Sequence, residues 1–296
     1  MKIITRIKGG LGNQLFCYAA ARRLALVNNA ELVIDDVSGF VRDHEYQRRY
    51  SLGHFNIPCR KASPKERMEP FSRYRRSLAK LIARGQPFFQ RRYIEQEGDH
   101  FDARLLDLRL QGDIYLDGLW QNEGYFKDVE HIIRDDLRLI PPTDELNQGG
   151  SVKIKNSNNA VALHVRWFDA PGSTTINNIS ANYYQRAIAL MNEKIDSPRY
   201  FLFSDNPEAA RVKLGLAEGC VTLVDHNKGD ESAHADLWLM TLCQHFITAN
   251  STFSWWGAWL GGGKEKIVIC PDLEVREDKT SPWNLSGQLP SGWIKL

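Results

Sequence analysis

The sequence has little of several features that mark special classes of protein. It contains no run of about 18 consecutive apolar residues, which excludes a membrane-spanning helix. The residues after Met1 also lack the apolar centre of a signal peptide. The five cysteines are scattered and never spaced as Cys-x-x-Cys, which argues against a disulfide framework and a zinc site and predicts a reducing cytoplasm. A formal net charge of +2 is too small to indicate a nucleic-acid binder.

Familiar catalytic motifs are lacking as well. The sequence holds no HExxH, no GxSxG, no phosphate-binding P-loop and no Asp-x-Asp pair. We therefore predict no metal cofactor. Any negative charge on a ligand must then be neutralised by groups of the protein itself.

Strand and helix patterns alternate along the chain, which predicts an α/β architecture with parallel sheets. Ser180 is well placed to cap a helix. The predicted strands are 2–7, 31–35, 160–165, 199–204, 221–225, 245–249 and 266–271, and the predicted helices are 13–28, 180–195, 208–216, 235–244 and 251–260.

A segment rich in Pro, Gly, Asn and Ser, residues 140–159, separates the two series of elements. Such a composition is typical of a linker. We therefore predict two α/β domains, residues 1–150 and 151–296. Domains of this kind bind ligands at the ends of their strands, and two of them would enclose a cleft.

Residues 60–92 depart from the average composition, with eleven Lys or Arg and two acidic residues. Tyr74, Leu78, Leu81 and Ile82 recur there at helical spacing between basic residues. One interpretation is a surface helix that contacts an anionic membrane or an acidic partner. The other is an ordinary solvated helix.

The first candidate site is the glycine turn "KGGLGNQLF", residues 8–16, between a strand and a helix. Backbone N–H groups at a helix start attract anions. Gly10 and Gly12 fit a dinucleotide fingerprint, with Asp35 or Asp36 as the acid that binds ribose. Leu15, however, stands at the third glycine position, which argues against NAD. Asn13 and Gln14 could reach a ligand, or Asn13 could cap the helix.

The second candidate site is "VALHVRWFDAPG", residues 161–172, in which a buried strand ends in charged residues. Burying a charge without a partner costs several kcal/mol (roughly), so the charges need compensation. Arg166 can bind a phosphate in a bidentate fork, and His164 can hydrogen-bond a base or sugar. The alternative is an internal Arg166–Asp169 ion pair.

The third candidate site is "FITANSTFSWWGAW", residues 246–259, in which Asn-Ser-Thr opens an aromatic helix. Hydroxyls and free N–H groups there form a second anion cradle. The tryptophans of this helix either stack on sugars or, as we expect for most of them, pack in the core. Asp205 and Asp236 are carboxylates that could bind a guanine edge or cap a helix.

Four segments together resemble the bacterial α-1,2-fucosyltransferase family: "GGLGNQLFCYAAA", "GLWQNEGYF" (118–126), "FSDNPEAAR" and "DLWLMTLCQHFITANSTFSWWGAWL". The resemblance implies a GT-B-type glycosyltransferase with two Rossmann-like domains facing across a cleft. It also implies transfer of L-fucose from GDP-L-fucose to the 2-hydroxyl of a galactoside, with inversion and without metal. The acceptor would be a bacterial glycan such as an O-antigen, bound by the first domain, and the second domain would bind the donor.

The resemblance also implies roles for particular residues. Arg166 would bind the β-phosphate and stabilise the leaving group, and Asp169 and Asn13 would join it in the catalytic set. Trp120, Gln121 and Glu123 would face the acceptor. The residues expected at the donor are Gly10, Gly12, Asn13, His164, Arg166, Ser204, Asp205, Asp236, Asn250, Ser251, Thr252 and Phe253.

Trp167 departs from the family pattern His-x-Arg-Arg-x-Asp, because it stands where the second arginine is usual. Losing one charged hydrogen bond costs about 1.5–3 kcal/mol. Trp167 therefore marks either an active subgroup or a non-catalytic protein that binds a nucleotide sugar or glycan. Asp169, Glu123 and Asp36 remain alternatives for a general base.

Overall fold

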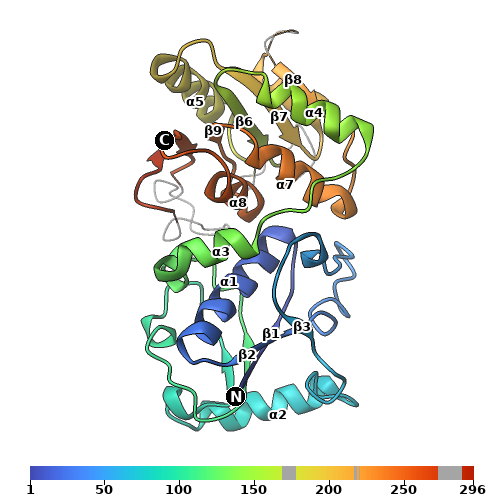
Figure 1. Ribbon diagram of the computed structural model, residues 1–296, viewed down its shortest axis with the longest axis vertical. Helices are drawn as coiled ribbons and strands as arrows, with labels where there is room; N and C mark the ends of the chain where they lie inside the picture. Colours follow the sequence, from blue (N-terminus) through green and yellow to red (C-terminus); the bar gives the residue numbers. More distant parts are fainter. Residues whose placement is uncertain (169–177, 217–218, 220, 273–288) are drawn as a thin grey trace. The chain divides into compact units, whose positions relative to one another are not determined.

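The computed structural model describes residues 1–168, 178–216, 219, 221–272 and 289–296. The chain forms two compact units, Met1–Leu139 and Ile140–Leu296 (Figure 1). This division after Leu139 lies before the boundary predicted after residue 150. The reason is that helix α4 (Glu145–Lys155) forms inside the predicted linker, begins at the side-chain cap of Asp144, and packs on α7 (Ala233–Thr241) of the second unit.

The first unit, all of whose residues are described, is built on a five-stranded parallel sheet in the order β3-β2-β1-β5-β4. Helix α1 (Leu11–Val27) connects β1 to β2, and α2 (Ser72–Arg84) packs on β4. The chain ends this unit with α3 (Glu130–Asp136). Its strands are β1 (Lys2–Arg6), β2 (Glu31–Asp35), β3 (Arg60–Lys61), β4 (Tyr93–Glu95) and β5 (Ile114–Asp117).

The second unit has, within its described residues, a six-stranded parallel sheet in the order β11-β10-β9-β6-β7-β8. Counted from β6, this is the order 3-2-1-4-5-6 of the Rossmann fold read from its other edge. Its strands are β6 (Ala160–Val165), β7 (Arg199–Ser204), β8 (Val221–Val224), β9 (His245–Ile247), β10 (Val268–Cys270) and β11 (Ile294–Lys295), and its other helices are α5 (Ala181–Lys194), α6 (Pro207–Leu214) and α8 (Thr252–Leu260).

The predicted α/β class is confirmed, and the predicted strands agree with the observed ones to within about two residues at each end. The Ser180 hydroxyl accepts the Tyr183 N–H and caps α5 as expected. Helix α1 begins at Leu11, two residues before the predicted start, with Gly10 in the capping position. Short 3₁₀ turns complete the chain: η1 (Leu52–His54), η2 (Phe88–Gln90), η3 (Ala103–Leu105), η4 (Glu123–Tyr125), η5 (Lys127–Val129) and η6 (Asp230–Ser232).

In each sheet, one pair of neighbouring strands separates the strands that come earlier in the chain from those that come later, and we call this pair the switch point. In the second unit it lies between β6 and β9, and in the first unit between β1 and β5. Open α/β sheets bind ligands at the carboxyl ends of the strands beside such a point. The predicted site residues fall at these places, since Arg166 follows β6, Asn250 follows β9, and Gly10 follows β1.

Candidate functional site

His164 lies inside the carboxyl end of β6 and is buried, with 5% of its surface exposed. Burial, with the nearby charge of Arg166, lowers the pKa of His164 to about 3, so the imidazole is neutral at ordinary pH. Its ring lies 5.5 Å, centroid to centroid, from that of Phe253 in the first turn of α8. Its buried Nδ1 has no hydrogen-bond partner within the described part of the chain. A buried polar atom left without a partner is costly, which makes His164 a candidate ligand-binding group.

Arg166 pairs with Asp205, the residue that follows β7, at 2.9 Å between Nη1 and Oδ2. The same carboxylate accepts the backbone N–H of Trp167 at 3.1 Å, so Asp205 holds the turn after β6. Asp169 lies outside the described residues, and the predicted Arg166–Asp169 alternative stays untested. About a third of each side chain in the Arg166–Asp205 pair is exposed, which leaves the guanidinium accessible to an anion.

Trp167 turns its side chain into the second unit. The indole packs against the hydrophobic core there, and the Lys213 ammonium of α6 lies 4.4 Å from the centre of its ring. Lys213 also donates to the carbonyl of Ile179 at 2.8 Å. The tryptophan thus has a packing role at the position where the family pattern has a second arginine.

The start of α8 lies beside the end of β6. Ser251 is the N-cap, and its hydroxyl accepts the Phe253 N–H at 3.3 Å. Thr252 is the first helical residue, and Asn250 is buried just before the cap. The positive N-terminal end of α8 therefore lies next to the neutral imidazole of His164, because the Phe253 and His164 rings are in contact. Arg166 lies at the same strand ends, directly after β6. Ser204 ends β7 close by, and its hydroxyl accepts the Asn206 N–H at 3.1 Å.

Asp236 lies in the first turn of α7, which begins at Ala233, two residues before the predicted start at residue 235. Its Oδ1 accepts a hydrogen bond from Asn227 at 2.8 Å. Burial raises the pKa of Asp236 to about 7, against the opposing effect of that hydrogen bond. Asn227 exchanges side-chain hydrogen bonds with Asn147 of α4, which also contacts His226.

In the first unit the glycine turn positions an amide pair. Asn13 does not cap α1, because Gly10 occupies that position and Asn13 is the third helical residue. Its Oδ1 instead accepts a hydrogen bond from Gln121 Nε2 at 2.7 Å. The two amides bridge the ends of β1 and β5, the switch point of this sheet. A Cβ at Gly10 would come within 2.5 Å of Arg48 Nη1, the far end of a flexible side chain that can move aside.

Gln14, the other predicted amide, is not available to a ligand. It is 1% exposed, and its side chain donates to the carbonyls of Gly9 and Arg49 and accepts the N–H of Ser51. This amide fastens the segment before η1 to the glycine turn. Gly12 is buried in the first turn of α1.

Trp120, which we expect to face the acceptor, has a buried side chain. It is 1% exposed, because its ring lies edge-on against Tyr125 at 5.5 Å between centroids. Its backbone has a positive φ of 52°, an uncommon conformation for a bulky residue, and turns the chain so that Gln121 reaches Asn13. Glu123 is paired with Lys127 at 3.1 Å. Of the predicted acceptor group, Gln121 is the member the structure joins to the glycine turn.

The acid expected for ribose is already occupied. Asp35 is fully buried and accepts hydrogen bonds from the Val37 and Ser38 N–H groups, the Ser38 hydroxyl and the Tyr115 hydroxyl. Asp36 is paired with Lys61 at 2.9 Å. The dinucleotide interpretation therefore finds no free acid at the end of β2.

Sequence reasoning missed a buried charge cluster at the end of β5. Asp117 accepts from Arg6, Lys8 and the Tyr93 hydroxyl at 3.2, 2.9 and 2.6 Å. Burial alone would raise the pKa of Asp117, but the charges of Lys8 and Arg6 bring it well below its ordinary value. The signal was available, since Asp117 ends an apolar strand as Arg6 does. The Asn147–Asn227 pair had no such signal.

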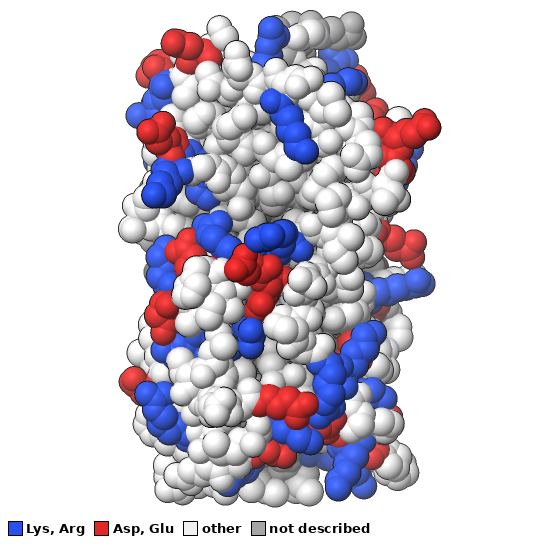
Figure 2. All heavy atoms as spheres, viewed as in Figure 1, with Lys and Arg blue, Asp and Glu red and all other residues white. Residues whose placement is uncertain are grey.

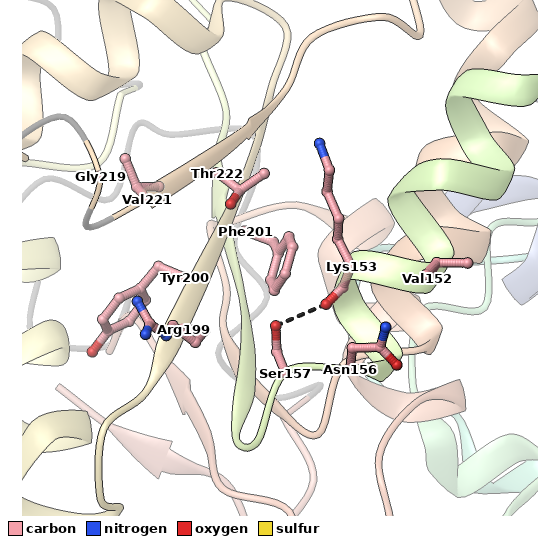
Figure 3. A pocket seen from close by; sticks show the side chains of 10 residues that line it. All are labelled: Val152, Lys153, Asn156, Ser157, Arg199, Tyr200, Phe201, Gly219, Val221 and Thr222. Atoms are coloured by element: carbon pink, nitrogen blue, oxygen red, sulfur yellow. Dashed lines mark hydrogen bonds between the residues drawn. The ribbon is translucent and has the colours of Figure 1, made fainter.

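A pocket of about 380 Å³ lies at the amino ends of strands β7 and β8 of the second sheet (Figure 3). Its lining includes Arg199 and Val221, which begin β7 and β8, and Lys153 and Ser157 at the end of α4. Ligand sites in parallel sheets lie at the carboxyl ends of the strands. This pocket is therefore separate from the carboxyl ends of the strands, where His164 and Arg166 lie.

Within the described ranges, no three or more His, Cys, Asp or Glu side chains are grouped so that they could hold a metal ion. In the same ranges, no helix has the length and apolar character needed to cross a membrane. The cysteines at 17, 59, 243 and 270 are free, and Cys220 lies outside the described residues.

Known proteins similar to this chain include two from Escherichia coli. An alpha-1,2-colitosyltransferase is 26% identical over 307 aligned positions, covering 99% of this chain and 98% of that protein. The O-antigen biosynthesis glycosyltransferase WbnK is 28% identical over 290 positions, covering 90% and 92%.

Solved structures show the same fold. The NodZ alpha-1,6-fucosyltransferase soaked with GDP-fucose has a TM-score of 0.55 at 18% identity, covering 94% of this chain and 97% of that one. A mutant of FUT1 from Arabidopsis thaliana in complex with GDP has a TM-score of 0.54 at 13% identity, covering 90% and 69%. The predicted glycosyltransferase fold with two α/β domains is confirmed by this likeness.

The model of one family, glycosyl transferase family 11, matches residues 2–286. That match spans both units and all four of the segments in which the sequence resembled fucosyltransferases. The chain belongs to glycosyl transferase family 11, and the protein is a glycosyltransferase.

Proposed function

We propose that the protein transfers L-fucose from GDP-L-fucose to the 2-hydroxyl of a galactoside in a bacterial glycan, with inversion. The observation that carries the proposal is the meeting of Arg166, His164 and the start of α8 beside the β6–β9 switch point. The family match and the likeness to fucosyltransferases that bind GDP-fucose and GDP support the donor.

The diphosphate is bound, in this proposal, by groups that carry positive charge or free N–H bonds. The Arg166 guanidinium gives up part of its contact with Asp205 and donates two hydrogen bonds to the β-phosphate. The N-terminus of α8, with Ser251 and Thr252, faces the same charge. Neutral His164 supplies a hydrogen bond to the donor through its unpartnered Nδ1 or through Nε2. Asp236 holds the guanine edge, and Asn227 keeps its carboxylate oriented.

The reaction breaks the bond between fucose C1 and the β-phosphate oxygen. GDP leaves with the electron pair, and the acceptor oxygen forms the new bond to C1 from the opposite face. Preorganised positive groups stabilise the charge that develops on the phosphate. The acceptor proton passes to a general base, for which Asp169, Glu123 and Asp36 are the alternatives, or to the departing phosphate.

The acceptor side of the proposal rests on the first unit. The Asn13–Gln121 pair closes the switch point between β1 and β5 and presents amides that can bind sugar hydroxyls. Trp120 acts from behind this pair, as the residue whose backbone turn aims Gln121.

The test is transfer by the purified chain, with GDP-fucose, a panel of galactosides and EDTA. We expect GDP release and a product whose linkage NMR identifies as α-1,2. Because a relative is named as a colitosyltransferase, a colitosyl donor is run beside the fucosyl one. No turnover with either donor on any acceptor, but donor binding in calorimetry, would favour the non-catalytic alternative that Trp167 suggests.

Loss of turnover in EDTA would overturn the metal-independent part of the proposal. Binding of NAD(H) would favour the dinucleotide interpretation of the glycine turn and, with it, the alternative of an NAD-dependent oxidoreductase. We also propose a cytoplasmic enzyme that contacts the inner membrane peripherally through residues 60–92.

A further inference from the structure

Helix α2 carries its large apolar side chains on the side that faces away from the protein. Tyr74, Leu78, Leu81 and Ile82 are 73, 58, 68 and 56% exposed. Ala83, in contrast, is buried against the sheet, where it packs near Tyr93 of β4. An ordinary amphipathic helix turns its apolar stripe to the core, so α2 is reversed in this respect.

The inward side of α2 is satisfied by polar contacts. Lys80 bonds Glu95 of β4 and lies 3.6 Å from Asp117. These bonds, with the small residues Ala79 and Ala83, hold the helix to the sheet. The outward apolar side chains are therefore not needed to attach α2.

Arginines flank the apolar stripe on both sides. At 100° per residue, Arg75 falls beside Ile82 on one flank, and Arg73 and Arg84 fall on the other. The helix has no acidic residue, and no carboxylate within the described part of the chain pairs with Arg73 or Arg75. Phe71, just before the helix, is 72% exposed and extends the stripe. Figure 2 shows Lys and Arg gathered at the lower right of the view, near the end where Figure 1 draws α2.

We propose that α2 lies in the interface of an anionic lipid bilayer, with Phe71, Tyr74, Leu78, Leu81 and Ile82 inserted between the headgroups. Apolar side chains bordered by arginines are the pattern of helices that bind such surfaces. A second copy of the chain fits less well, since a two-fold contact through this stripe would bring its arginines together. The inference rests on the peripheral membrane contact proposed above for residues 60–92 and deepens it, because it names the helix and the side chains that enter the bilayer; it is independent of sugar transfer.

Vesicle flotation of the full chain tests the inference without donor or acceptor. Phosphatidylcholine vesicles are compared with vesicles that contain about one third phosphatidylglycerol. We expect the chain to float with the anionic vesicles and not with the neutral ones, and added salt to release it. Failure to float with anionic vesicles at low salt would overturn the proposal, and this result needs no variant.

Two double variants locate the contact. Leu78→Gln with Leu81→Gln keeps helix propensity and should weaken the partition about tenfold or more for each leucine. Arg73→Gln with Arg75→Gln should weaken it about fivefold for each arginine, the equivalent of about 1 kcal/mol each.

The matched control is Leu146→Gln with Val152→Gln, two exposed apolar residues of α4 in the second unit. It should bind vesicles as the original chain does, and thermal unfolding should show all three variants folded. Equal loss in the control would overturn the assignment to α2. Two other results would overturn it. One is a dimer, detected by light scattering, that dissociates in the leucine variant. The other is binding to an acidic protein without any binding to vesicles.

Discussion

Replacing Arg166 by alanine should remove most of the transfer activity while leaving the fold almost as stable as before. The arginine forms a part-exposed ion pair with Asp205, and such pairs contribute about 0–1 kcal/mol to the free energy of unfolding. For a chain of this size, a loss of that magnitude lowers the melting temperature by about 2–4 °C or less. The core of the second unit should not be disturbed, because the guanidinium lies beyond the carboxyl end of β6, outside the core.

The effect on the reaction should be far larger. Removing one preorganised donor from a developing negative charge costs about 2.7–4 kcal/mol, or about 100- to 1,000-fold in kcat. Arg166→Lys keeps the charge but loses the planar fork, so we expect an intermediate loss. The assay is GDP release from GDP-fucose with a galactoside acceptor, at saturating and at low donor.

Arg211→Ala is the matched control, since Arg211 forms an ion pair with Glu208 in the same unit, on helix α6. Its activity should stay near that of the original chain. Transfer by Arg166→Ala within about threefold of the original would refute the role given to Arg166. So would a loss of several kcal/mol in stability, because the activity could then reflect unfolding.

Three other predictions follow from buried groups. Because the pKa of Asp236 is raised to about 7, the affinity for GDP in calorimetry should fall about tenfold per pH unit below 7, and Asp236→Asn should remove that dependence; a slope that persists would contradict the guanine role. Because the pKa of His164 is lowered to about 3, its imidazole binds a proton near pH 6.5 in the unfolded chain but not in the folded chain. The free energy of unfolding should therefore decrease as pH falls from about 6.5 toward 3, and His164→Gln should be less steep by up to about 1.4 kcal/mol per pH unit in urea titrations. Asp136 binds the Tyr18 hydroxyl at 2.8 Å and Arg22 at 2.7 Å, so Asp136→Ala should cost about 3–5 kcal/mol, whereas the exposed neighbour Asp135→Ala should stay within about 0.5 kcal/mol.

Local patterns in the sequence were enough for the α-helices and strands from β6 to β10, for β1, α1 and β2, and for the strand ends that carry the polar site residues. They gave no prediction for the strands β3, β4, β5 and β11 or for the helices α3 and α4. Apolar runs that end in His164, Arg166 or Asn250 predict buried strands with polar ends, because strand periodicity and turn residues act over a few neighbours. Long, specific segments also placed the chain in its family before any geometry was known. The linker was predicted less well, since α4 is stabilised by its packing on α7, far along the chain.

The partners of the site residues were decided by tertiary structure alone. That Arg166 meets Asp205, that Asn13 meets Gln121, and that Gln14 is used up in holding a loop depends on which strand ends lie side by side. The strand orders set those neighbours, and they join residues more than 100 positions apart in the case of Asn13 and Gln121. The sequence alone predicted the strands from β6 to β10 and those on either side of α1, their polar ends and the family resemblance. The fold decided which of those polar groups are accessible, like Arg166, and which, like Asp35, are satisfied by hydrogen bonds inside the protein, because burial and hydrogen bonding depend on neighbours that no local pattern specifies.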